Sequence, residues 1–410
     1  MIKISAPNKD ISGKINLTAS KSESNRALVI QALCETDFEI DNLAEAKDTE
    51  TLVELLSIVK SNNNDSILTL DVGPAGTTFR FLTAFLSVRN GNYILTGSER
   101  MLERPCGILV GALQSLGADI KYLGKEGYPP LQITGRSLDN NKVNIKGNVS
   151  SQFISALMLI APSLKNGLTI NFTTELVSKP YITMTSSIMS HFGAEVKWNE
   201  NGISISNKKY EAKNFTVEAD WSAASYWYEI ACLAKSAEIE LTGLKKESLQ
   251  ADANCVNIFA ELGVKTSFNS NGVTLIKKEN KTSFFKYDFE ECPDIAQTLA
   301  VTLGAKNIES KLYGLQTLKI KETDRIIALK TELKKFDCST NSSNDSLYID
   351  TDFKKEMIAE VATYHDHRMA MAFAPLALVC SHIFIEDENV VEKSYPKFWE
   401  DLKQIGFSIE

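Results

Sequence analysis

The sequence predicts an α/β or α+β protein in which one helix–strand unit is repeated six times and divided between two domains. Three observations predict this class. The chain has 410 residues, 43% of them hydrophobic and 23% charged, which is more than one hydrophobic core usually holds. Two kinds of helix alternate along the chain, and short strands rich in Val, Ile and Leu separate them.

The first kind is an amphipathic helix that ends near a glycine and is followed by a strand-like alternation. Glycine suits such an end because it readily adopts a left-handed C-cap. Four members are GALQSLGADI, HFGAEV, ELGVKT and QIGFSI, around Gly117, Gly193, Gly263 and Gly406. Two weaker members without the glycine begin at Thr49 and Arg325. The six lie roughly 55 to 75 residues apart, a spacing typical of repeated supersecondary units.

The second kind of helix is apolar on almost every side and carries its polar residues in the first turn. We expect these helices at 24–33, 76–86, 150–161, 222–234, 293–303 and 366–379, with strands at 92–97, 168–173, 237–243 and 382–387. The pattern indicates helices that are buried all round and have exposed N-termini. Each unit therefore reads as a buried helix, strands, an amphipathic helix and a strand.

The helix starts carry polar and basic residues that point to an anion site. They include Lys21, Ser22, Arg26, Gly76, Thr77, Arg80, Ser150, Ser151, Gln152, Asp294, His367 and Arg368, and the loops before the amphipathic helices add Arg100, Arg104, Ser178, Lys179, Lys321, Arg325 and Lys393. A helix N-terminus attracts anions through its free N–H groups and its dipole. Cations at a helix N-terminus oppose the dipole, so the presence of many of them at such positions calls for a local explanation, which an anion site provides.

Each of these residues also has a structural interpretation. Single basic residues are often solvated surface groups, Ser150 and Ser151 can be N-caps, and His367 can be bonded to a nearby backbone group. The segment KETDR, from Lys321 to Arg325, is the most concentrated signal. Lys321 and Arg325 are spaced i, i+4, so we expect them on one helix face with Glu322 pointing elsewhere.

Charge and motifs exclude several other functions. A net charge of −8 argues against broad nucleic-acid or membrane binding. The seven cysteines show no CxxC pair and are interpreted as reduced core thiols. The start lacks a signal-peptide profile and no apolar stretch is long enough to span a bilayer, which predicts a cytoplasmic protein. Without GxxxxGK[ST], GxGxxG, HExxH or GxSxG, chemistry based on ATP, dinucleotides or zinc has no support.

Nine segments in order resemble the motifs of the 5-enolpyruvylshikimate-3-phosphate synthase family. They are LTASKSESNRAL, GPAGTTFR, LTGSERMLERP, VSSQF, LVSKPY, PD, KETDR, YHDHRMAMAF and EKSYP, and they run from about Leu17 to Pro396. The resemblance implies a two-domain inside-out α/β barrel of six βαβαββ-type units, three per domain. Domain one would comprise 1–18 and 220–410, and domain two would comprise 19–219. The active site would lie in the cleft between them, and the protein would be a monomer.

The resemblance also implies the reaction and its residues. The enolpyruvyl group of phosphoenolpyruvate would pass to the 5-hydroxyl of shikimate 3-phosphate with release of phosphate, on the shikimate pathway to chorismate and the aromatic amino acids. Shikimate 3-phosphate would be bound by Lys21, Ser22, Arg26, Ser150, Ser151, Gln152, Ser178, Tyr181, Asp294, Thr317 and Lys321. Phosphoenolpyruvate would be bound by Lys21, Gly76, Thr77, Arg104, Gln152, Arg325, His367, Arg368 and Lys393, with Arg80 supporting the Gly76 loop.

The implied mechanism needs a base, an acid and charge stabilisation in one site. Asp294 is the candidate base for the hydroxyl, and Lys21 and Glu322 are both candidates for moving the methylene proton. Two residues depart from the family pattern: Thr317 replaces an asparagine near the shikimate ring, and Pro74 replaces the asparagine that opens the NAGT segment. The first can alter one hydroxyl contact, and the second only stiffens a turn.

The charges balance without a metal or another cofactor. Two phosphates and two carboxylates bring about six negative charges, against Lys21, Arg26, Arg80, Arg104, Lys321, Arg325, Arg368 and Lys393. The alternatives are a different enolpyruvyl transfer, an anion-binding protein without catalysis, and a relative of RNA-end-processing enzymes. Phosphate release that requires both substrates in metal-free buffer separates these readings.

Overall fold

A computed structural model describes residues 1–62, 66–350 and 352–410. The chain divides into two compact units: unit 1 comprises Met1–Ala19 and Glu218–Glu410, and unit 2 comprises Ser20–Val217. Each unit has its own cluster of buried hydrophobic side chains. The inserted unit 2 is thus a continuous stretch of chain, whereas unit 1 is made from both ends.

The strands of the described residues form five four-stranded sheets of one topology and a two-stranded sheet. The unit that shows the topology most clearly runs β4 (Leu68–Asp71), α3 (Gly76–Val88), β5 (Gly91–Thr96), α5 (Gly107–Ser115), β6 (Asp119–Tyr122) and β7 (Leu131–Gly135). β4 pairs with β5 in parallel, and β7 pairs antiparallel with both β5 and β6. Two parallel neighbours need a crossover, and α3 supplies it. The order is therefore βαβαββ, and the predicted fold class is confirmed.

Four further sheets repeat this parallel-then-antiparallel order. In unit 2 the sheet is β8 (Lys142–Ile145), β9 (Leu168–Phe172), β11 (Gly202–Ile205) and β10 (Val196–Asn199). Unit 1 has β2 (Asp10–Ile15), β13 (Ser236–Thr242), β15 (Gly272–Lys277) and β14 (Val264–Asn269); β16 (Phe284–Asp288), β17 (Glu309–Tyr313), β19 (Leu347–Ile349) and β18 (Thr340–Ser342); and β20 (Glu360–Val361), β21 (Ile383–Ile385), β1 (Ile2–Ser5) and β22 (Ser408–Ile409). The remaining copy, in unit 2, keeps only the parallel pair β3 (Ile40–Asp41) and β12 (Phe215–Thr216).

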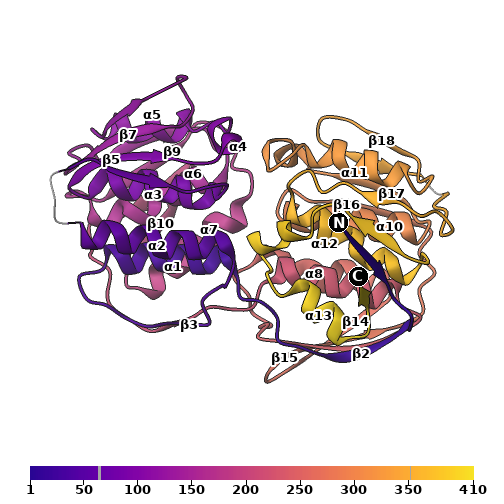
Figure 1. Ribbon diagram of the computed structural model, residues 1–410. Coiled ribbons are helices and arrows are strands. Elements are labelled where there is room, and N and C mark those ends of the chain that lie inside the picture. The colour runs from indigo at the N-terminus through magenta and orange to yellow at the C-terminus, as the bar shows by residue number, and fades with distance from the viewer. Residues whose placement is uncertain (63–65, 351) are drawn as a thin grey trace. The chain divides into compact units, whose positions relative to one another are not determined.

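The buried helices lie inside each unit and the sheets lie outside them (Figure 1). They are α1 (Lys21–Leu33), α3 and α6 (Ser151–Ile160) in unit 2, and α8 (Trp221–Leu233), α10 (Ala296–Ala305) and α12 (His367–Phe373) in unit 1. In unit 2 the three helices contact one another, and in unit 1 α10 contacts both α8 and α12. Every residue of α10 and α12 is buried. The prediction of helices buried all round is confirmed.

The amphipathic helices alternate with the buried ones, as predicted. They are α2 (Lys47–Ser61), α5 and α7 (Lys179–His191) in unit 2, and α9 (Cys255–Ala260), α11 (Arg325–Lys334) and α13 (Phe398–Gln404) in unit 1. The shorter helical elements are α4 (Glu99–Leu102), η1 (Ala161–Ser163), η2 (Ala251–Asn254), η3 (Pro293–Ile295), η4 (Gln316–Ile320), η5 (Ala374–Leu378) and η6 (Glu388–Lys393). One predicted helix is shorter than expected: α12 stops at Phe373 and continues as η5. Pro375 lies at the start of η5, and proline cannot donate the backbone bond that an α-helix needs.

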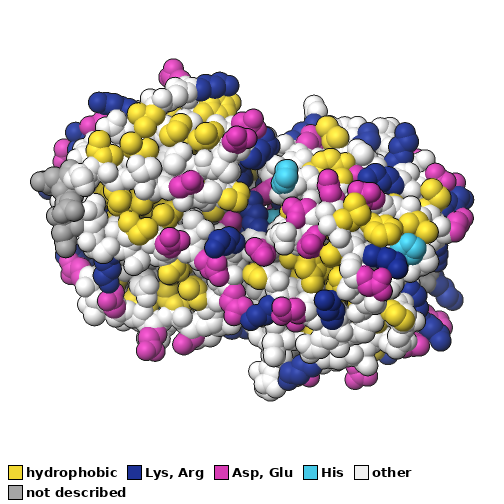
Figure 2. All heavy atoms as spheres, viewed as in Figure 1, with side chains coloured by type: hydrophobic (Ala, Val, Ile, Leu, Met, Phe, Trp, Pro, Cys, Tyr) yellow, Lys and Arg dark blue, Asp and Glu magenta, His cyan; other side chains and the backbone are white. Residues whose placement is uncertain are grey.

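The described residues contain no helix that is both long and apolar enough to cross a membrane. All seven cysteines are free, and only Cys34 is not buried. Burial raises the pKa of the Cys106, Cys292 and Cys338 thiols to about 12, so they stay protonated at neutral pH. On the face shown in Figure 2, Lys and Arg side chains are interspersed with Asp and Glu.

Candidate active site

Asp294 is the centre of the charged cluster in unit 1. It lies in η3, directly before the buried helix α10. Its Oδ1 atom is 3.2 Å from Arg325 Nη1 and 3.6 Å from Lys321 Nζ, and its Oδ2 atom is 3.1 Å from Arg368 Nη2. One carboxylate thus holds three cations, two from the KETDR segment and one from the start of α12.

Arg325, the first residue of α11, ties this cluster to two more carboxylates. Its Nε atom is 2.7 Å from Asp366 Oδ2, and its Nη2 atom is 3.0 Å from Glu322 Oε2. The other oxygen of Glu322 accepts a hydrogen bond from Lys393 Nζ at 2.8 Å. A planar guanidinium with donors in fixed directions suits three partners at once, which a lysine ammonium does less well.

The expected geometry of KETDR is wrong in two respects. Lys321 and Glu322 precede the helix, because Asp324 is the N-cap and its side chain accepts from the Ile326 and Ile327 N–H groups. Glu322 turns back to Arg325 and does not point elsewhere. Lys321 and Arg325 still converge, but on Asp294 and through a loop.

The pKa shifts follow from this arrangement. Burial opposes ionisation of Asp294, but Arg368, Lys321 and Arg325 outweigh it and hold the pKa of that carboxyl well below its usual range. For Lys321 burial has the larger effect: it lowers the pKa of the ammonium, although the nearby Asp294 and Glu322 favour the charged form. Asp294 is therefore fully ionised in this arrangement and is a weak base while its three cations remain in place.

His367 and Thr317 also lie in unit 1. His367 begins α12 with a side chain only 3% exposed, and its Nδ1 atom is 3.6 Å from Asp366 Oδ1. Thr317 lies in η4, and its hydroxyl is buried without a hydrogen-bond partner among the described residues. A buried hydroxyl without a partner loses the bonds that it makes to water, so this group is available to a ligand.

Unit 2 holds a second set of predicted residues at the N-terminus of α1. Lys21 Nζ is 3.0 Å from Asp48 Oδ2, a carboxylate with a side chain only 4% exposed. Arg26, one turn further on, donates to the backbone oxygen of Ser22 at 2.7 Å and to that of Tyr181 at 3.4 Å. Burial lowers the pKa of Arg26 to about 10, although the nearby Tyr181 and Glu23 oppose this. Arg26 therefore fixes the segments that carry Ser22 and Tyr181.

The N-terminus of α3 holds two buried arginines close to Gly76. Arg80 Nη1 donates to the Gly76 carbonyl at 2.8 Å, and a Cβ atom built on Gly76 would lie 2.6 Å from Arg80 Nη1 and 2.5 Å from Arg104 Nη1. Gln152 Nε2 donates to Thr77 Oγ1 at 2.9 Å, which joins α6 to α3. Glycine is needed at this position because only hydrogen leaves room for both guanidiniums.

The predicted serines lie at the starts of α6 and α7. Ser150 occupies the N-cap position of α6, but its side chain makes no capping hydrogen bond. Ser178 precedes α7 with φ of 53°, a left-handed conformation that is uncommon for a residue other than glycine. Strain of this kind is often found at binding sites.

Two acidic residues that hold the predicted cations, Asp48 and Asp366, were not predicted from the sequence. Asp48 holds Lys21, and Asp366 holds Arg325 and accepts from the Arg368 N–H group. Asp366 was visible in the DHR motif, where an acidic residue before an apolar helix signals an N-cap. Asp48 lies at the start of an amphipathic helix, where acidic residues are common, so no sequence pattern distinguishes it.

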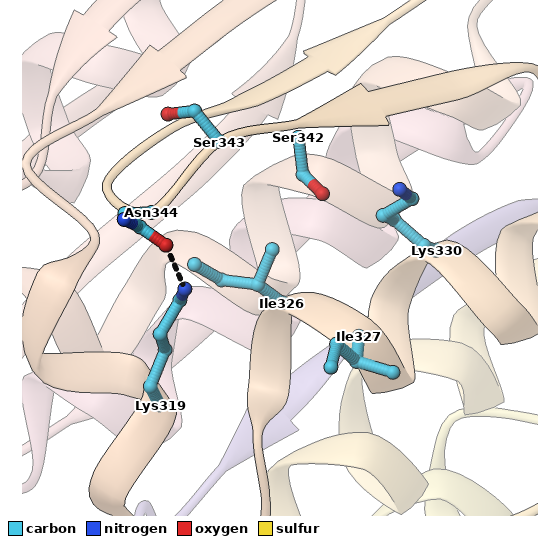
Figure 3. Close-up of a pocket in the computed structure, with 7 residues that line it drawn as sticks. All are labelled: Lys319, Ile326, Ile327, Lys330, Ser342, Ser343 and Asn344. Atoms are coloured by element: carbon cyan, nitrogen blue, oxygen red, sulfur yellow. Dashed lines mark hydrogen bonds between the residues drawn. The ribbon is translucent and has the colours of Figure 1, made fainter.

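A pocket of about 540 Å³ lies elsewhere in unit 1, between η4, α11 and β18. Its lining residues are Lys319, Ile326, Ile327, Lys330, Ser342, Ser343 and Asn344, and Lys319 donates to Asn344 across it (Figure 3). It contains none of the predicted substrate-binding or catalytic residues. Among the described residues there is also no group of three His, Cys, Asp or Glu side chains placed to hold a metal ion.

Comparisons with known proteins agree on one family. Residues 5–402 match the family described as EPSP synthase (3-phosphoshikimate 1-carboxyvinyltransferase). A 3-phosphoshikimate 1-carboxyvinyltransferase of Bacteroides fragilis is 47% identical over 410 residues, 99% of this chain and 98% of its own, and one of Sulfurovum sp. is 37% identical with 98% of both chains covered.

Solved structures of the same fold extend the comparison. The fold of EPSP synthase from Acinetobacter baumannii matches with a TM-score of 0.80 at 22% identity, covering 100% of this chain and 99% of that one. The enolpyruvyl transferase NikO from Streptomyces tendae matches with a TM-score of 0.76 at 14% identity, covering 100% and 98%.

Proposed function

Because this chain belongs to the EPSP synthase family and is an enolpyruvyl transferase of the shikimate pathway, we propose that the charged clusters of units 1 and 2 act together on its two substrates. The family acts on shikimate 3-phosphate and phosphoenolpyruvate. The observation that carries the proposal is Asp294, an ionised carboxylate that holds three cations. Such cations are available to substrate anions by exchange of partners.

We propose that substrate binding turns Asp294 into an effective base. The phosphates and carboxylates of the substrates compete for Arg368, Lys321 and Arg325, which now stabilise the Asp294 carboxylate. Each cation that moves to a substrate raises the proton affinity of Asp294. The base is thus weak in the empty enzyme and gains strength when both substrates are bound.

The binding residues divide by substrate. For shikimate 3-phosphate we propose Ser150, Ser151, Ser178 and Lys321 at the phosphate, Ser22, Arg26 and Tyr181 at the carboxylate, and Lys21, Gln152, Asp294 and Thr317 around them. For phosphoenolpyruvate we propose Lys21, Arg325 and Arg368 at the carboxylate, Gly76, Arg104, Gln152 and Lys393 at the phosphate, and Thr77 and His367 nearby. The unpartnered Thr317 hydroxyl supports its place at a substrate hydroxyl.

The chemistry then proceeds by addition and elimination. Asp294 accepts the proton of the 5-hydroxyl while the hydroxyl oxygen bonds to the central carbon of phosphoenolpyruvate. The methylene carbon receives a proton from Lys21 or Glu322. In the tetrahedral intermediate, the methyl group returns a proton and the C–O bond to phosphate breaks, which restores the double bond. The nearby cations stabilise the departing phosphate. No electron acceptor is required, because no group is oxidised.

We further propose that the enzyme works as a monomer in the cytoplasm without a metal or another cofactor. The test is phosphate release by the purified protein in metal-free buffer, with each substrate alone and with both. We expect release only with both, together with formation of the enolpyruvyl ether. Release without shikimate 3-phosphate would indicate a phosphatase, and no release at all would indicate an anion-binding protein.

A further inference from the structure

A second buried carboxylate, Asp252, is linked to Arg368 through the side chain of Ser222. It belongs to η2 and is only 5% exposed. The Ser222 hydroxyl, in the first turn of α8, donates to Asp252 Oδ2. Arg368 Nη2 donates to the same Ser222 oxygen at 3.3 Å. The three side chains form one chain of hydrogen bonds: the guanidinium donates to the serine, and the serine donates to the carboxylate.

The direction of these bonds follows from the chemistry of a hydroxyl. Serine has a single O–H donor, and a carboxylate can only accept it when ionised. Once that proton points to Asp252, the lone pairs of the serine oxygen face Arg368. If Asp252 becomes neutral, this preference is lost, because a protonated carboxyl can itself donate and leave the serine free to rotate.

The segment that carries Asp252 is firmly attached to α8. The Trp221 N–H group donates to Gln250 Oε1 at 3.0 Å, and Gln250 Nε2 donates to the Ala219 carbonyl at 2.9 Å. Both bonds join Gln250 to residues just before Ser222 in the chain, so they hold the same two segments together as the Ser222–Asp252 bond. Asp252 is therefore held at a fixed place relative to Ser222, as a positioning group must be.

Arg368 has few other supports within unit 1. Nη1 donates to the buried Tyr226 hydroxyl at 3.4 Å, Nη2 makes the ion pair with Asp294, and Nε is buried without a partner among the described residues. When a substrate anion replaces Asp294, the hydrogen bonds to Tyr226 and Ser222 still fix the plane of the guanidinium. A fixed plane matters because an arginine binds a carboxylate through two parallel N–H groups.

From this geometry we infer that Asp252 is a positioning residue of the phosphoenolpyruvate site, which orients Arg368 through Ser222. The inference rests on the proposed function only in that Arg368 binds the phosphoenolpyruvate carboxylate. It adds two residues, Asp252 and Ser222, that contact no substrate themselves.

The charge state of Asp252 makes this role sensitive to pH. Burial, together with the negative charges of Asp294 and Asp220, raises the pKa of Asp252 to about 7, against the opposing effect of Arg368 and Ser222. Among the described residues, the thiols of Cys255 in α9 and Cys292 before η3 also face Asp252, and burial keeps both protonated. Asp252 is thus ionised above neutral pH and becomes neutral as the pH falls.

The test compares Asp252→Asn and Ser222→Ala with the wild type by steady-state kinetics. At pH 8.5 we expect each variant to raise the KM for phosphoenolpyruvate about tenfold, the effect of losing one hydrogen bond to a charged group, with less than a twofold change for shikimate 3-phosphate. The pH dependence of kcat/KM reports the ionisation of the free enzyme. The kcat/KM of the wild type divided by that of Asp252→Asn should therefore fall towards one at pH 5.5, where Asp252 is neutral. Asp252→Glu should recover part of the loss at pH 8.5.

The matched control is Asp401→Asn, since Asp401 is a half-buried carboxylate that accepts a hydrogen bond from the Tyr395 hydroxyl at 2.6 Å. It should leave the KM for phosphoenolpyruvate unchanged. A wild-type KM in either test variant at pH 8.5, an equal rise for both substrates, or a ratio that does not vary with pH would overturn the inference. If Asp252→Asn does not fold, Ser222→Ala decides alone. A wild-type enzyme without any turnover would instead refute the proposed function.

Discussion

Asp294 shows how a single side chain can be prepared for a reaction before the substrates arrive. Its three cations keep it ionised, and they are the groups that we propose for binding the substrate anions. The same exchange of partners that binds the substrates would therefore switch on the base. Other buried acids of this protein are in different environments, and their expected behaviour differs accordingly.

Replacing Asp294 should remove most of the activity without unfolding the protein. We expect Asp294→Asn to lower kcat by about 10² to 10⁴-fold, the usual contribution of a general base, and Lys21→Met to do the same if Lys21 moves the methylene proton. The exposed Asp288→Asn, also in unit 1, is the control and should keep the wild-type rate. Circular dichroism would verify folding, and near-normal kcat in either variant would remove that residue from the mechanism.

Glu229 is the opposite case, an acid that costs stability. It lies in the middle of α8, fully buried, and neither carboxylate oxygen has a hydrogen-bond partner within the described chain. The Thr302 hydroxyl, which favours the charged form of Glu229, donates its proton to the Thr298 carbonyl. Burial therefore raises the pKa of Glu229 well above its usual value. A carboxyl with a raised pKa in the folded state stabilises at low pH and costs stability as the pH rises.

Glu229→Gln should consequently increase the free energy of unfolding at pH 8 but not near pH 4. We expect a gain of about 1 to 3 kcal/mol at pH 8, since one pKa unit corresponds to about 1.4 kcal/mol. Urea unfolding of unit 1 at both pH values measures it. Glu332→Gln is the contrasting control, because Glu332 is buried but bonded to Tyr364 at 2.7 Å and Lys335 at 2.8 Å, so its replacement should destabilise. A gain that is equal at both pH values would contradict the explanation.

How far the sequence could predict such residues depends on what signal each one has. Lys321, Arg325 and Arg368 were visible because basic residues at helix starts are unusual. Asp252 was not, since a single acidic residue in a short turn resembles any surface loop residue. Its importance comes from burial and from the approach of Ser222 across thirty positions of chain, and the sequence pattern carries neither.

Helix starts determine where the functional groups of this protein lie. The α11 start shows the limit of spacing arguments: an i, i+4 pair was expected, but Asp324 caps the helix and leaves Lys321 and Glu322 in the preceding loop. Asp324 was in the motif, and its preference for the N-cap position outweighs helical spacing. By contrast, the apolar composition of the six buried helices was enough to predict them, because only burial on all sides tolerates it.

The start of α3 allows a direct test of such a helix terminus. Gly76→Ala places a methyl group 2.5 Å from Arg104 Nη1 and 2.6 Å from Arg80 Nη1, so both guanidiniums must move. We expect the KM for phosphoenolpyruvate to rise about tenfold through weaker contacts to the charged phosphate, with little change for shikimate 3-phosphate. Gly111→Ala in α5 is the control, since its Cβ meets nothing within 4 Å, and it should be neutral or slightly stabilising. Equal effects on both substrates would mean that Gly76 does not shape the phosphoenolpyruvate site.

Two separate hydrophobic cores make the whole molecule a pair of folding units. The described strands of each unit pair only within that unit, and each unit has its own cluster of buried side chains. Small cores of this size usually unfold cooperatively and independently. The proposed contacts to shikimate 3-phosphate come from both units, with Ser151 in unit 2 and Lys321 in unit 1.

Calorimetry of the empty protein should therefore show two unfolding transitions, and shikimate 3-phosphate should raise the temperature of both. A ligand at one hundred times its Kd stabilises by about 2.7 kcal/mol, which is readily measured for a domain of this size. Shikimate, which lacks the phosphate, is the control and should have a much smaller effect. An increase in only one transition would show that a single unit supplies all the contacts.

The two N-terminal strands have a consequence for how the protein is made. β2 pairs in parallel with β13, and β1 pairs with β21 and β22, all of them beyond the inserted unit 2. On the ribosome, β1 is translated long before its partners β21 and β22, a wait of about 20 to 80 s at 5 to 20 residues per second. Unit 2 can complete its sheets during that time, while the first strands stay unpaired with exposed edges. We expect nascent chains to need chaperones chiefly for the segment Met1–Ala19, which makes it the part of unit 1 most exposed to misassembly.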